Sequence, residues 1–415
     1  MMSALLITNI GSLVGLHPQE TLMLRGNQMQ ELPTMENAWV LCEEGKISDF
    51  GKMDSLPVDL PNTILTHDAK GGFVFPSWCD SHTHIVFAAS REEEFVMKID
   101  GKSYEDIAAA GGGILNSARK LQLASEDQLY DSAAIRLTDM IKQGTGAVEI
   151  KSGYGLTTDS ELKMLRVIRR LKENFQIPVK ASFLAAHAYP PEYKNNHEGY
   201  IKLIIEEMLP KIADEGLADY MDAFCEQGFF SVEDTDRLLL AGARYGLKPK
   251  IHANQLSVSG GVQVGVKHRA ISVDHLEATD DAVIESLRTS DTIATLLPSC
   301  SFYINIPFAN ARGLINANIP VAVATDYNPG STPSGNMNLV VSLACIKLRM
   351  RPEEAINAAT LNGAAAMELS REVGSIAKGK RANLFITRPM SSLAFLPYSF
   401  GQSQIDTIVL NGKLS

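Results

Sequence analysis

The sequence predicts an α/β protein, a (β/α)8 TIM-like barrel with a small β-sandwich domain formed by both termini. In the middle of the 415 residues, short apolar runs rich in β-branched residues alternate with amphipathic helical runs. There are about eight such runs, which is the number of strands that a closed parallel barrel needs. Both ends of the chain carry β-type runs that are too short to bury a core alone, so we expect them to form one domain together.

The terminal runs justify the composite domain. Near the N-terminus, a β-type run at 38–42 leads through a glycine turn into a second run at 47–50. Near the C-terminus, the runs at 382–387 and 407–410 are also β-type, and the Asn-Gly pair that follows is typical of a hairpin turn. The resulting division assigns residues 1–70 and 375–415 to the β-sandwich domain and 71–374 to the barrel.

The barrel is expected to contain both strands and covering helices. Its strands are predicted near residues 73–80, 145–151, 178–187, 219–226, 249–255, 270–276, 291–298 and 319–326. A helix over 159–175 would place Leu162, Leu165 and Ile168 on one face, and Ser231 begins another with a capping-box-like pattern. An open doubly wound sheet is the alternative, but no GxGxxG motif follows the first strand.

Composition narrows the classes of function. The net charge is −10 and no cluster of Lys and Arg could follow a phosphate backbone, so we expect no nucleic-acid partner. No apolar run is long enough to cross a bilayer, so we expect no membrane association. The five cysteines are scattered and form no CxxC pair, which indicates free thiols in a reducing compartment and a cytoplasmic location.

Histidines mark the functional face. Five of the nine fall at the carboxyl ends of predicted strands, and they are His82, His84, His187, His252 and His275. In a parallel barrel these ends share one face, which carries the active site. His82 and His84 are two residues apart on a strand and point the same way. Each could be an ordinary surface or core histidine, but their shared placement favours a metal site.

A carboxylate completes the set of ligands. Asp326 follows the apolar run 320–325, where a carboxylate is costly unless it is paired or bound to a metal. With His82, His84 and His252 it would supply three imidazoles and one carboxylate, which suit one Zn²⁺ or Fe²⁺ ion.

Two further histidines could act on a substrate. His275 suits a proton shuttle or a group that polarises a carbonyl. His187 lies at a strand end too, and a structural role for it is equally compatible with the sequence.

These residues resemble a known family over nearly the whole chain. The motif Asp80-x-His82-x-His84, the later His252 and His275, and Asp326 are similar to those of the amidohydrolase superfamily. Local motifs point to the branch that opens the ring of 4-imidazolone-5-propanoate; they are Ser90-Arg91-Glu92, Ala110-Gly111-Gly112-Gly113-Ile114, Lys151-Ser152-Gly153-Tyr154-Gly155-Leu156, Ala186-His187-Ala188 and Asp326-x-Asn328-Pro329-Gly330-Ser331.

The resemblance implies an activity and a set of site residues. It implies hydrolysis of 4-imidazolone-5-propanoate to N-formimino-L-glutamate in histidine degradation, by a homodimer that holds one divalent metal per subunit. It assigns the metal to His82, His84, His252 and Asp326. From the chemistry of the reaction, we expect Asp326, His275 and Gln255 to be the catalytic residues. The implied substrate contacts are Arg91, Tyr104, Tyr154, His187, Gln255, Asn328, Gly330 and Ser331.

The chemistry of single residues agrees with this substrate. Arg91 is a good bidentate clamp for a propionate, although alone it could be a surface ion pair with a neighbouring glutamate. Superfamily deaminases often carry glutamate where this chain has Gln255, and an amide cannot carry a proton. Some superfamily members bridge two metals with a carboxylated lysine, but this motif does not require that of Lys151, so a single metal is expected.

Three hypotheses of different classes remain open. The first is hydrolysis of the imidazolone. The second is another cyclic-amide hydrolase or a nucleobase deaminase on the same fold, and release of ammonia from cytosine or guanine would favour it. The third is a non-catalytic interaction protein on an amidohydrolase scaffold, for which loss of a metal ligand would be the sign.

Overall fold

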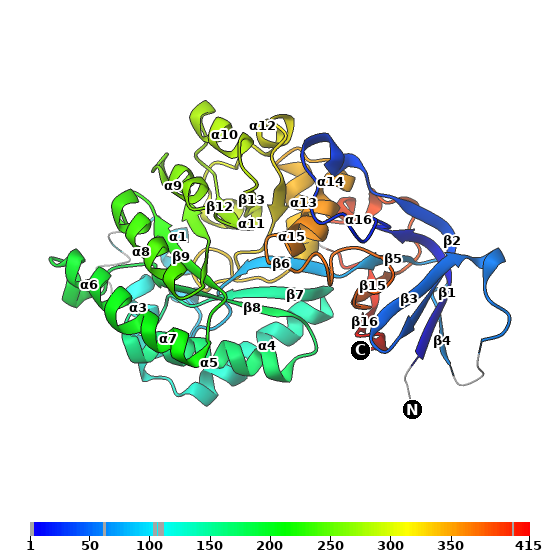
Figure 1. Ribbon diagram of the computed structural model, residues 1–415, viewed down its shortest axis with the longest axis horizontal. Helices are drawn as coiled ribbons and strands as arrows, with labels where there is room; N and C mark the ends of the chain where they lie inside the picture. Colours follow the sequence, from blue (N-terminus) through cyan, green and yellow to red (C-terminus); the bar gives the residue numbers. More distant parts are fainter. Residues whose placement is uncertain (1–3, 61–63, 103–105, 107–111, 401) are drawn as a thin grey trace.

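The computed structural model describes residues 4–60, 64–102, 106, 112–400 and 402–415. Two sheets organise the chain and lie beside each other in Figure 1. One is the parallel sheet of the barrel, and the other is a mixed sheet built from both ends of the chain. This arrangement confirms the predicted TIM-like barrel with a separate β unit formed by the two termini.

Eight barrel strands follow one another in chain order. They are β6 (Trp78–Thr83), β7 (Thr145–Lys151), β8 (Val179–Ala186), β9 (Tyr220–Cys225), β11 (Ile251–Ala253), β12 (Ser272–His275), β13 (Ile293–Leu296) and β14 (Val321–Val323). A two-residue strand, β10 (Lys248–Pro249), pairs with β9 just before β11. Each strand lies in or beside one of the predicted runs, because fully buried parallel strands need continuous apolar sequence.

Backbone contacts link the first barrel strand to the last. The N–H of Asp326 donates to the carbonyl of His82 at 3.0 Å, and the N–H of His84 donates to the carbonyl of Tyr327 at 2.8 Å. Thr83 and Tyr327 form a parallel bridge between them. The segment that follows β14 therefore lies directly beside the end of β6, which brings an aspartate next to two histidines.

The predicted run at 73–80 is divided between the two sheets. Its first half forms β5 (Phe73–Pro76), which pairs with terminal strands, and its second half belongs to β6. Ser77 makes the transfer, since its N–H donates to the Asn383 carbonyl at 3.0 Å while the next N–H bonds to Gly144 in the barrel. Pro76 and Ser77 interrupt the apolar run at this point, but they do not specify which sheet each half joins.

The terminal sheet has its own core. Its strands are β1 (Ala4–Val14), β2 (Thr34–Glu43), β3 (Lys46–Lys52), β4 (Leu65–Asp68), β5, β15 (Leu384–Thr387), β16 (Ile405–Leu410) and β17 (Lys413–Leu414). Leu5, Ile7, Val40 and Leu384 are among the side chains buried within it. On the other face, Phe385 stacks on Phe75 at 5.0 Å, which ties this sheet to the barrel core.

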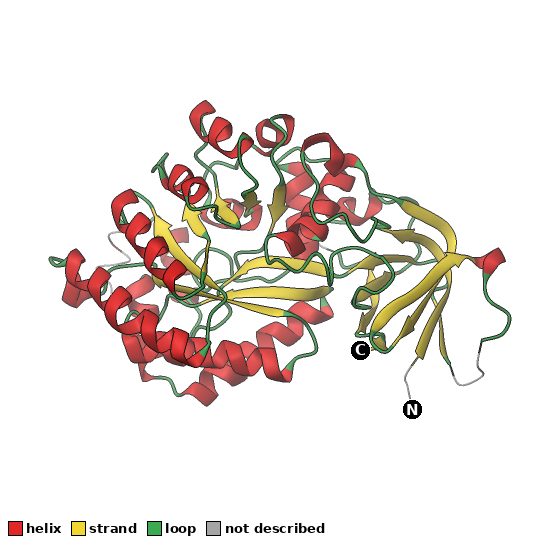
Figure 2. Ribbon diagram, in the orientation of Figure 1, coloured by secondary structure: helices red, strands yellow, loops and turns green. Residues whose placement is uncertain are grey.

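Helices surround the barrel strands (Figure 2). They are α1 (Glu92–Ile99), α3 (Ile114–Leu123), α4 (Glu126–Lys142), α5 (Thr158–Asn174), α6 (His197–Leu203), α7 (Leu209–Glu215), α8 (Val232–Arg244), α9 (Gly261–Lys267), α10 (Asp281–Arg288), α11 (Pro298–Ile304), α12 (Ala311–Asn316), α13 (Met337–Ile346), α14 (Pro352–Ala359), α15 (Leu361–Ala365) and α16 (Phe395–Tyr398). Both predicted helices are confirmed. The apolar face of α5 is buried, and the Ser231 hydroxyl accepts the Asp234 N–H at the start of α8.

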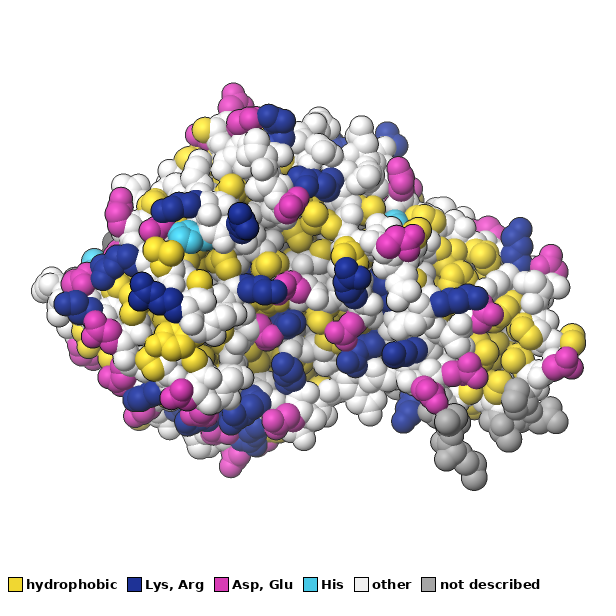
Figure 3. Space-filling model, viewed as in Figure 1, with side chains coloured by type: hydrophobic (Ala, Val, Ile, Leu, Met, Phe, Trp, Pro, Cys, Tyr) yellow, Lys and Arg dark blue, Asp and Glu magenta, His cyan; other side chains and the backbone are white. Residues whose placement is uncertain are grey.

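The surface shows no strong separation of charge on the face in Figure 3. Basic and acidic side chains are interspersed across it. Within the described ranges, no helix combines the length and the apolar character needed to cross a bilayer.

Candidate active site

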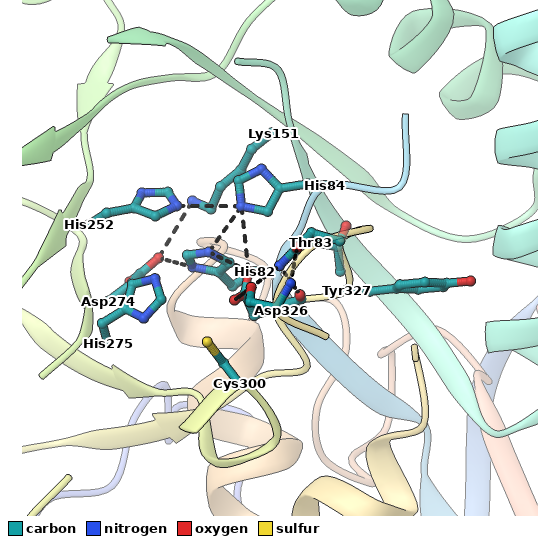
Figure 4. A network of polar contacts seen from close by, with 12 residues as sticks. His82, Thr83, His84, Lys151, His252, Asp274, His275, Cys300, Asp326 and Tyr327 are labelled. Carbon is teal, nitrogen blue, oxygen red and sulfur yellow. Dashed lines mark hydrogen bonds and ion pairs between the residues drawn. The ribbon is translucent and has the colours of Figure 1, made fainter. Parts of the chain in front are cut away.

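Three histidines meet at the carboxyl end of the barrel. His82 and His84 project from the end of β6, and His252 lies on β11. The Nε2 atom of His84 is 3.3 Å from that of His82 and 3.4 Å from that of His252. Figure 4 shows the three rings turned toward one another. All three side chains are buried. Three ring nitrogens therefore face one another at the base of the site.

The charge state of these rings follows from burial. Desolvation lowers the pKa of His82, His84 and His252 well below the usual histidine value, and nearby cationic groups lower it further. The rings are neutral near pH 7, so each can turn a lone pair toward the common centre. Such a triad of buried imidazoles is consistent with the divalent metal site of amidohydrolases.

A carboxylate lies beside the triad. The Oδ1 atom of Asp326 is 3.5 Å from the Nε2 atoms of both His82 and His84. Burial raises the pKa of Asp326, while its hydrogen-bond partners oppose that rise. The structure thus brings together the four side chains that were predicted from the sequence to be metal ligands.

Two carboxylates behind the triad orient its rings. The Nδ1–H of His82 donates to Oδ2 of Asp274 at 2.7 Å, and the Nδ1–H of His252 donates to Oδ1 of Asp222 at 3.1 Å. A proton held on Nδ1 leaves the Nε2 lone pair directed into the site. The sequence interpretation missed both aspartates; the available signal was a single carboxylate inside each apolar strand.

A buried lysine connects these aspartates. The Lys151 ammonium lies 2.8 Å from Asp222, 3.4 Å from Asp274 and 2.6 Å from Glu149, and Glu149 also pairs with Lys250. Burial alone would lower the pKa of Lys151, but the three carboxylates together raise it above its ordinary value. Lys151 is therefore a charged member of an ion-pair network beneath the triad.

The triad opens into a cavity of about 150 Å³, which suits a small molecule. The lining includes nearly every predicted substrate contact: Arg91, Tyr154, His187, Gln255, Asn328, Gly330 and Ser331. His84, His252, His275 and Asp326 line it too, with Ile114, Phe224 and Phe229 as apolar neighbours. The remaining predicted contact, Tyr104, lies outside the described residues.

Arg91 reaches the cavity from the start of α1. Its Nε donates to the Ser117 hydroxyl at 2.8 Å, and one terminal nitrogen is 4.0 Å from Glu94. A Cβ atom placed on Gly330 would lie 2.5 Å from that same nitrogen, Nη1. The glycine thus allows Arg91 to approach the backbone, and the guanidinium is held while its remaining donors stay available to a ligand.

A turn after β14 holds Asp326. The side-chain oxygen of Asn328 accepts the N–H groups of Gly330 and Ser331, each at 2.8 Å, and its amide donates to the Asp326 carbonyl. The Ser331 hydroxyl donates to Oδ2 of Asp326 at 3.1 Å. The predicted Asn328, Gly330 and Ser331 therefore form one hydrogen-bonded turn around the carboxylate.

The opposite wall carries Tyr154 and His187. The Nδ1–H of His187 donates to the Gly153 carbonyl at 3.1 Å, and its ring stacks on His84. Burial lowers the pKa of His187 to about 4 and raises that of the Tyr154 hydroxyl. Glu161, which the sequence interpretation missed, accepts three N–H groups of the loop that carries Tyr154. Both side chains are thus neutral groups held in fixed positions.

His275 and Gln255 lie near the triad on the remaining side. The His275 ring centroid is 5.5 Å from those of His82 and His252. Burial alone would lower its pKa, but Glu277 raises it above the ordinary value. The Gln255 amide donates to the Cys300 sulfur at 3.6 Å. A histidine that can carry a proton therefore stands next to the candidate metal site.

Backbone conformation also marks the site. His275 and Asp326 both have positive φ angles, 90° and 55°. Non-glycine residues rarely adopt this region, and each instance costs on the order of 1–3 kcal/mol. The hydrogen bonds around Asp326 oppose that cost, so its carboxylate direction is set by the backbone as well as by its neighbours.

Comparison with known proteins gives full-length matches. Residues 73–414 match the amidohydrolase family. The chain is 58% identical over 411 residues to the imidazolonepropionase of Christiangramia forsetii, covering 99% of each chain. It is 54% identical over 409 residues to that of Flavobacterium johnsoniae, again covering 99% of each. Among solved structures, an adenosine deaminase from Xanthomonas campestris with bound zinc is 16% identical with a TM-score of 0.70, covering 99% of this chain and 92% of that one.

Proposed function

The chain belongs to the imidazolonepropionases of the amidohydrolase family, and from this premise we propose that it hydrolyses 4-imidazolone-5-propanoate to N-formimino-L-glutamate. One observation carries the proposal beyond family membership. Three neutral imidazoles and a carboxylate face a common point, at the base of a small cavity whose wall presents an arginine. This is the arrangement needed to activate water beside a cyclic amide that bears a carboxylate tail.

We assign one divalent cation, Zn²⁺ or Fe²⁺, to His82, His84, His252 and Asp326. The donor set fits, because three neutral nitrogens and one carboxylate oxygen are ligands that both ions favour. When bound, the ion would supply Lewis-acid activation of water and of the ring carbonyl. Asp274 and Asp222 keep the ring nitrogens turned inward, and Ser331 fixes the carboxylate.

Residues of the chain accept and donate the protons of the reaction. Water adds to the ring carbonyl carbon and loses its proton to Asp326, whose carboxylate lies beside the triad. The bond between that carbon and the ring nitrogen breaks. His275 stabilises the developing oxyanion or relays the proton to the leaving nitrogen. Gln255 offers both a donor and an acceptor to the ring, and an amide in that place does not carry protons.

The cavity wall accounts for the choice of substrate. Arg91 is permanently charged and pairs with the propionate of the substrate. Tyr154, His187, Asn328, Gly330 and Ser331 complete the contacts around the ring and the tail. Neutral His187 and Tyr154 can hydrogen-bond the substrate without adding charge next to the metal ligands.

The direct test uses freshly made imidazolone propionate. The purified protein is expected to remove the ultraviolet absorbance of the substrate and to yield formiminoglutamate. His252→Ala is expected to lose bound metal and turnover together, whereas His67→Ala, which changes a histidine of the terminal sheet, keeps both. Release of ammonia from cytosine or guanine without imidazolone turnover would refute the proposal, and turnover by His252→Ala with metal still bound would refute the ligand assignment.

We further propose a cytoplasmic homodimer. The resemblance supports the dimer, and the five cysteines, none of which is in a disulfide, support a reducing compartment. Sedimentation analysis of the purified protein tests the oligomeric state, and a monomer at working concentration would contradict it.

A further inference from the structure

A second group of potential metal ligands lies next to the triad. It consists of His275 at the end of β12, Glu277 two residues later, and Cys300 on α11. All three side chains are buried, and one ligand atom of each lies within 4.8 Å of the others. Figure 4 shows the Cys300 sulfur turned toward the group of histidines. We call these three residues the second cluster.

Two atoms of the second cluster lack a hydrogen bond. His275 Nδ1 and Glu277 Oε2 form an ion pair at 3.6 Å, which is beyond hydrogen-bond distance, and neither atom has a hydrogen-bond partner among the described residues. The other oxygen of Glu277 accepts the Ser301 hydroxyl at 2.9 Å, which holds Oε2 toward the ring. Buried polar atoms of this kind call for a missing partner, and an ion is one of the ordinary explanations.

The spacing suits a tetrahedral cation. Bonds of about 2.0 to 2.3 Å place two tetrahedral ligands about 3.3 to 3.8 Å apart. The 3.6 Å between His275 Nδ1 and Glu277 Oε2 falls inside that range. A set of one imidazole, one carboxylate and one thiolate favours Zn²⁺ over the harder Mg²⁺ and Ca²⁺ ions.

We propose that His275, Glu277 and Cys300 form a second, zinc-binding site, distinct from the triad, and that its occupation inhibits the enzyme. Binding releases the thiol proton of Cys300 and, when His275 is protonated, the proton on its Nδ1. Both protons pass to solvent, and the fourth position of the ion stays open. An imidazole held through Nδ1 keeps its proton on Nε2 and cannot accept another. The inhibition rests on the role proposed for His275, whereas the binding does not.

Cobalt titration of the metal-stripped protein tests the binding. Thiolate ligation of Co²⁺ produces a sulfur-to-metal charge-transfer band, which a site of three histidines and one aspartate cannot produce. The wild-type protein is expected to bind about two equivalents, with the band growing only during the second. Cys300→Ser is expected to lose the band and bind about one equivalent, and Cys345→Ser, a matched thiol on α13, is expected to behave as wild type.

Several results would overturn the inference. They are saturation of the wild type at one equivalent without a thiolate band, a band that accompanies the first equivalent, and a band that persists in Cys300→Ser. If Cys300→Ser does not fold, Glu277→Gln provides the second variant, with at least about tenfold weaker binding of the second equivalent expected. A failure of the proposed function would be seen in a different measurement. The protein would then bind its first equivalent of metal but would not hydrolyse imidazolone propionate.

Excess zinc tests the functional consequence. In protein that already holds one equivalent, additional zinc is expected to lower kcat at least about tenfold, and Cys345→Ser is expected to respond as wild type does. Equal inhibition of Cys300→Ser by the same zinc concentrations would refute the second cluster as the inhibitory site.

Discussion

Replacing Asp274 by asparagine tests the orientation of the triad. The Oδ2 atom of Asp274 accepts the Nδ1–H of His82 at 2.7 Å, and both side chains are fully buried. Asparagine has nearly the same shape but no charge. Partners of this kind are worth about 10- to 100-fold in metal affinity, or about 1.4 to 2.7 kcal/mol. The short, buried bond places this variant near the upper end of that range.

The measurement is a zinc competition titration against a chromophoric chelator. Asp236→Asn is the matched control. Asp236 on α8 also pairs with a histidine at 2.7 Å, but that histidine is His268, at the end of α9 and outside the candidate site. Its zinc affinity is expected to equal that of the wild type. A zinc affinity of Asp274→Asn within about threefold of wild type, with an unchanged circular dichroism spectrum, would refute the orienting role.

Three further changes have defined outcomes. Arg91→Ala is expected to raise KM about 10- to 100-fold for the propionate-bearing substrate in steady-state assays, and an unchanged KM rejects the clamp. Gly330→Ala forces the Arg91 guanidinium to shift, so KM rises while metal content by elemental analysis stays the same; unaltered kinetics would contradict the close approach. Burial lowers the pKa of His17 from 6.5, so the unfolded state binds more protons and the free energy of unfolding falls as pH drops below about 6.5. Urea unfolding at about pH 7 and about pH 5 should show that the free energy of unfolding falls less in His17→Gln than in wild type. An equal fall in both proteins would exclude a contribution of His17 to the pH dependence of stability.

The barrel could be predicted because its strands satisfy a local rule. Buried parallel strands are continuous apolar runs, and seven of the eight predicted runs contain a barrel strand. The same rule could not divide the run at 73–80, because Pro76 and Ser77 interrupt it without specifying which sheet each half joins. What separates them is the pairing of Ser77 with Asn383, over three hundred residues away in the chain.

Some residues of the candidate site could be predicted from the sequence and others could not. His82, His84, His252 and Asp326 could be nominated because each follows an apolar run, and parallel topology brings such ends together. Asp222 and Asp274 each gave one signal, a single carboxylate inside an apolar strand, but periodicity does not encode the contacts between strands through which they orient the rings. The role of Glu161 could not be predicted from the sequence either, because its partners are backbone N–H groups of a loop.

The two sides of the triad differ in charge, and this difference decides where further cations can bind. On the β7 side, Lys151 is an ammonium surrounded by Asp222, Asp274 and Glu149. A lysine carbamate forms only from the neutral amine, so the carboxylates that keep Lys151 charged oppose the bridging group of a two-metal centre. The ammonium also repels a second dication on that side. On the β12 side there is a carboxylate, from Glu277, and a thiol that can become an anionic thiolate, from Cys300. Both groups attract a cation, whereas the Lys151 ammonium repels one. The network that orients the triad therefore opposes a second cation on the β7 side, which supports the single metal ion proposed there and leaves the β12 side as the place to test for another.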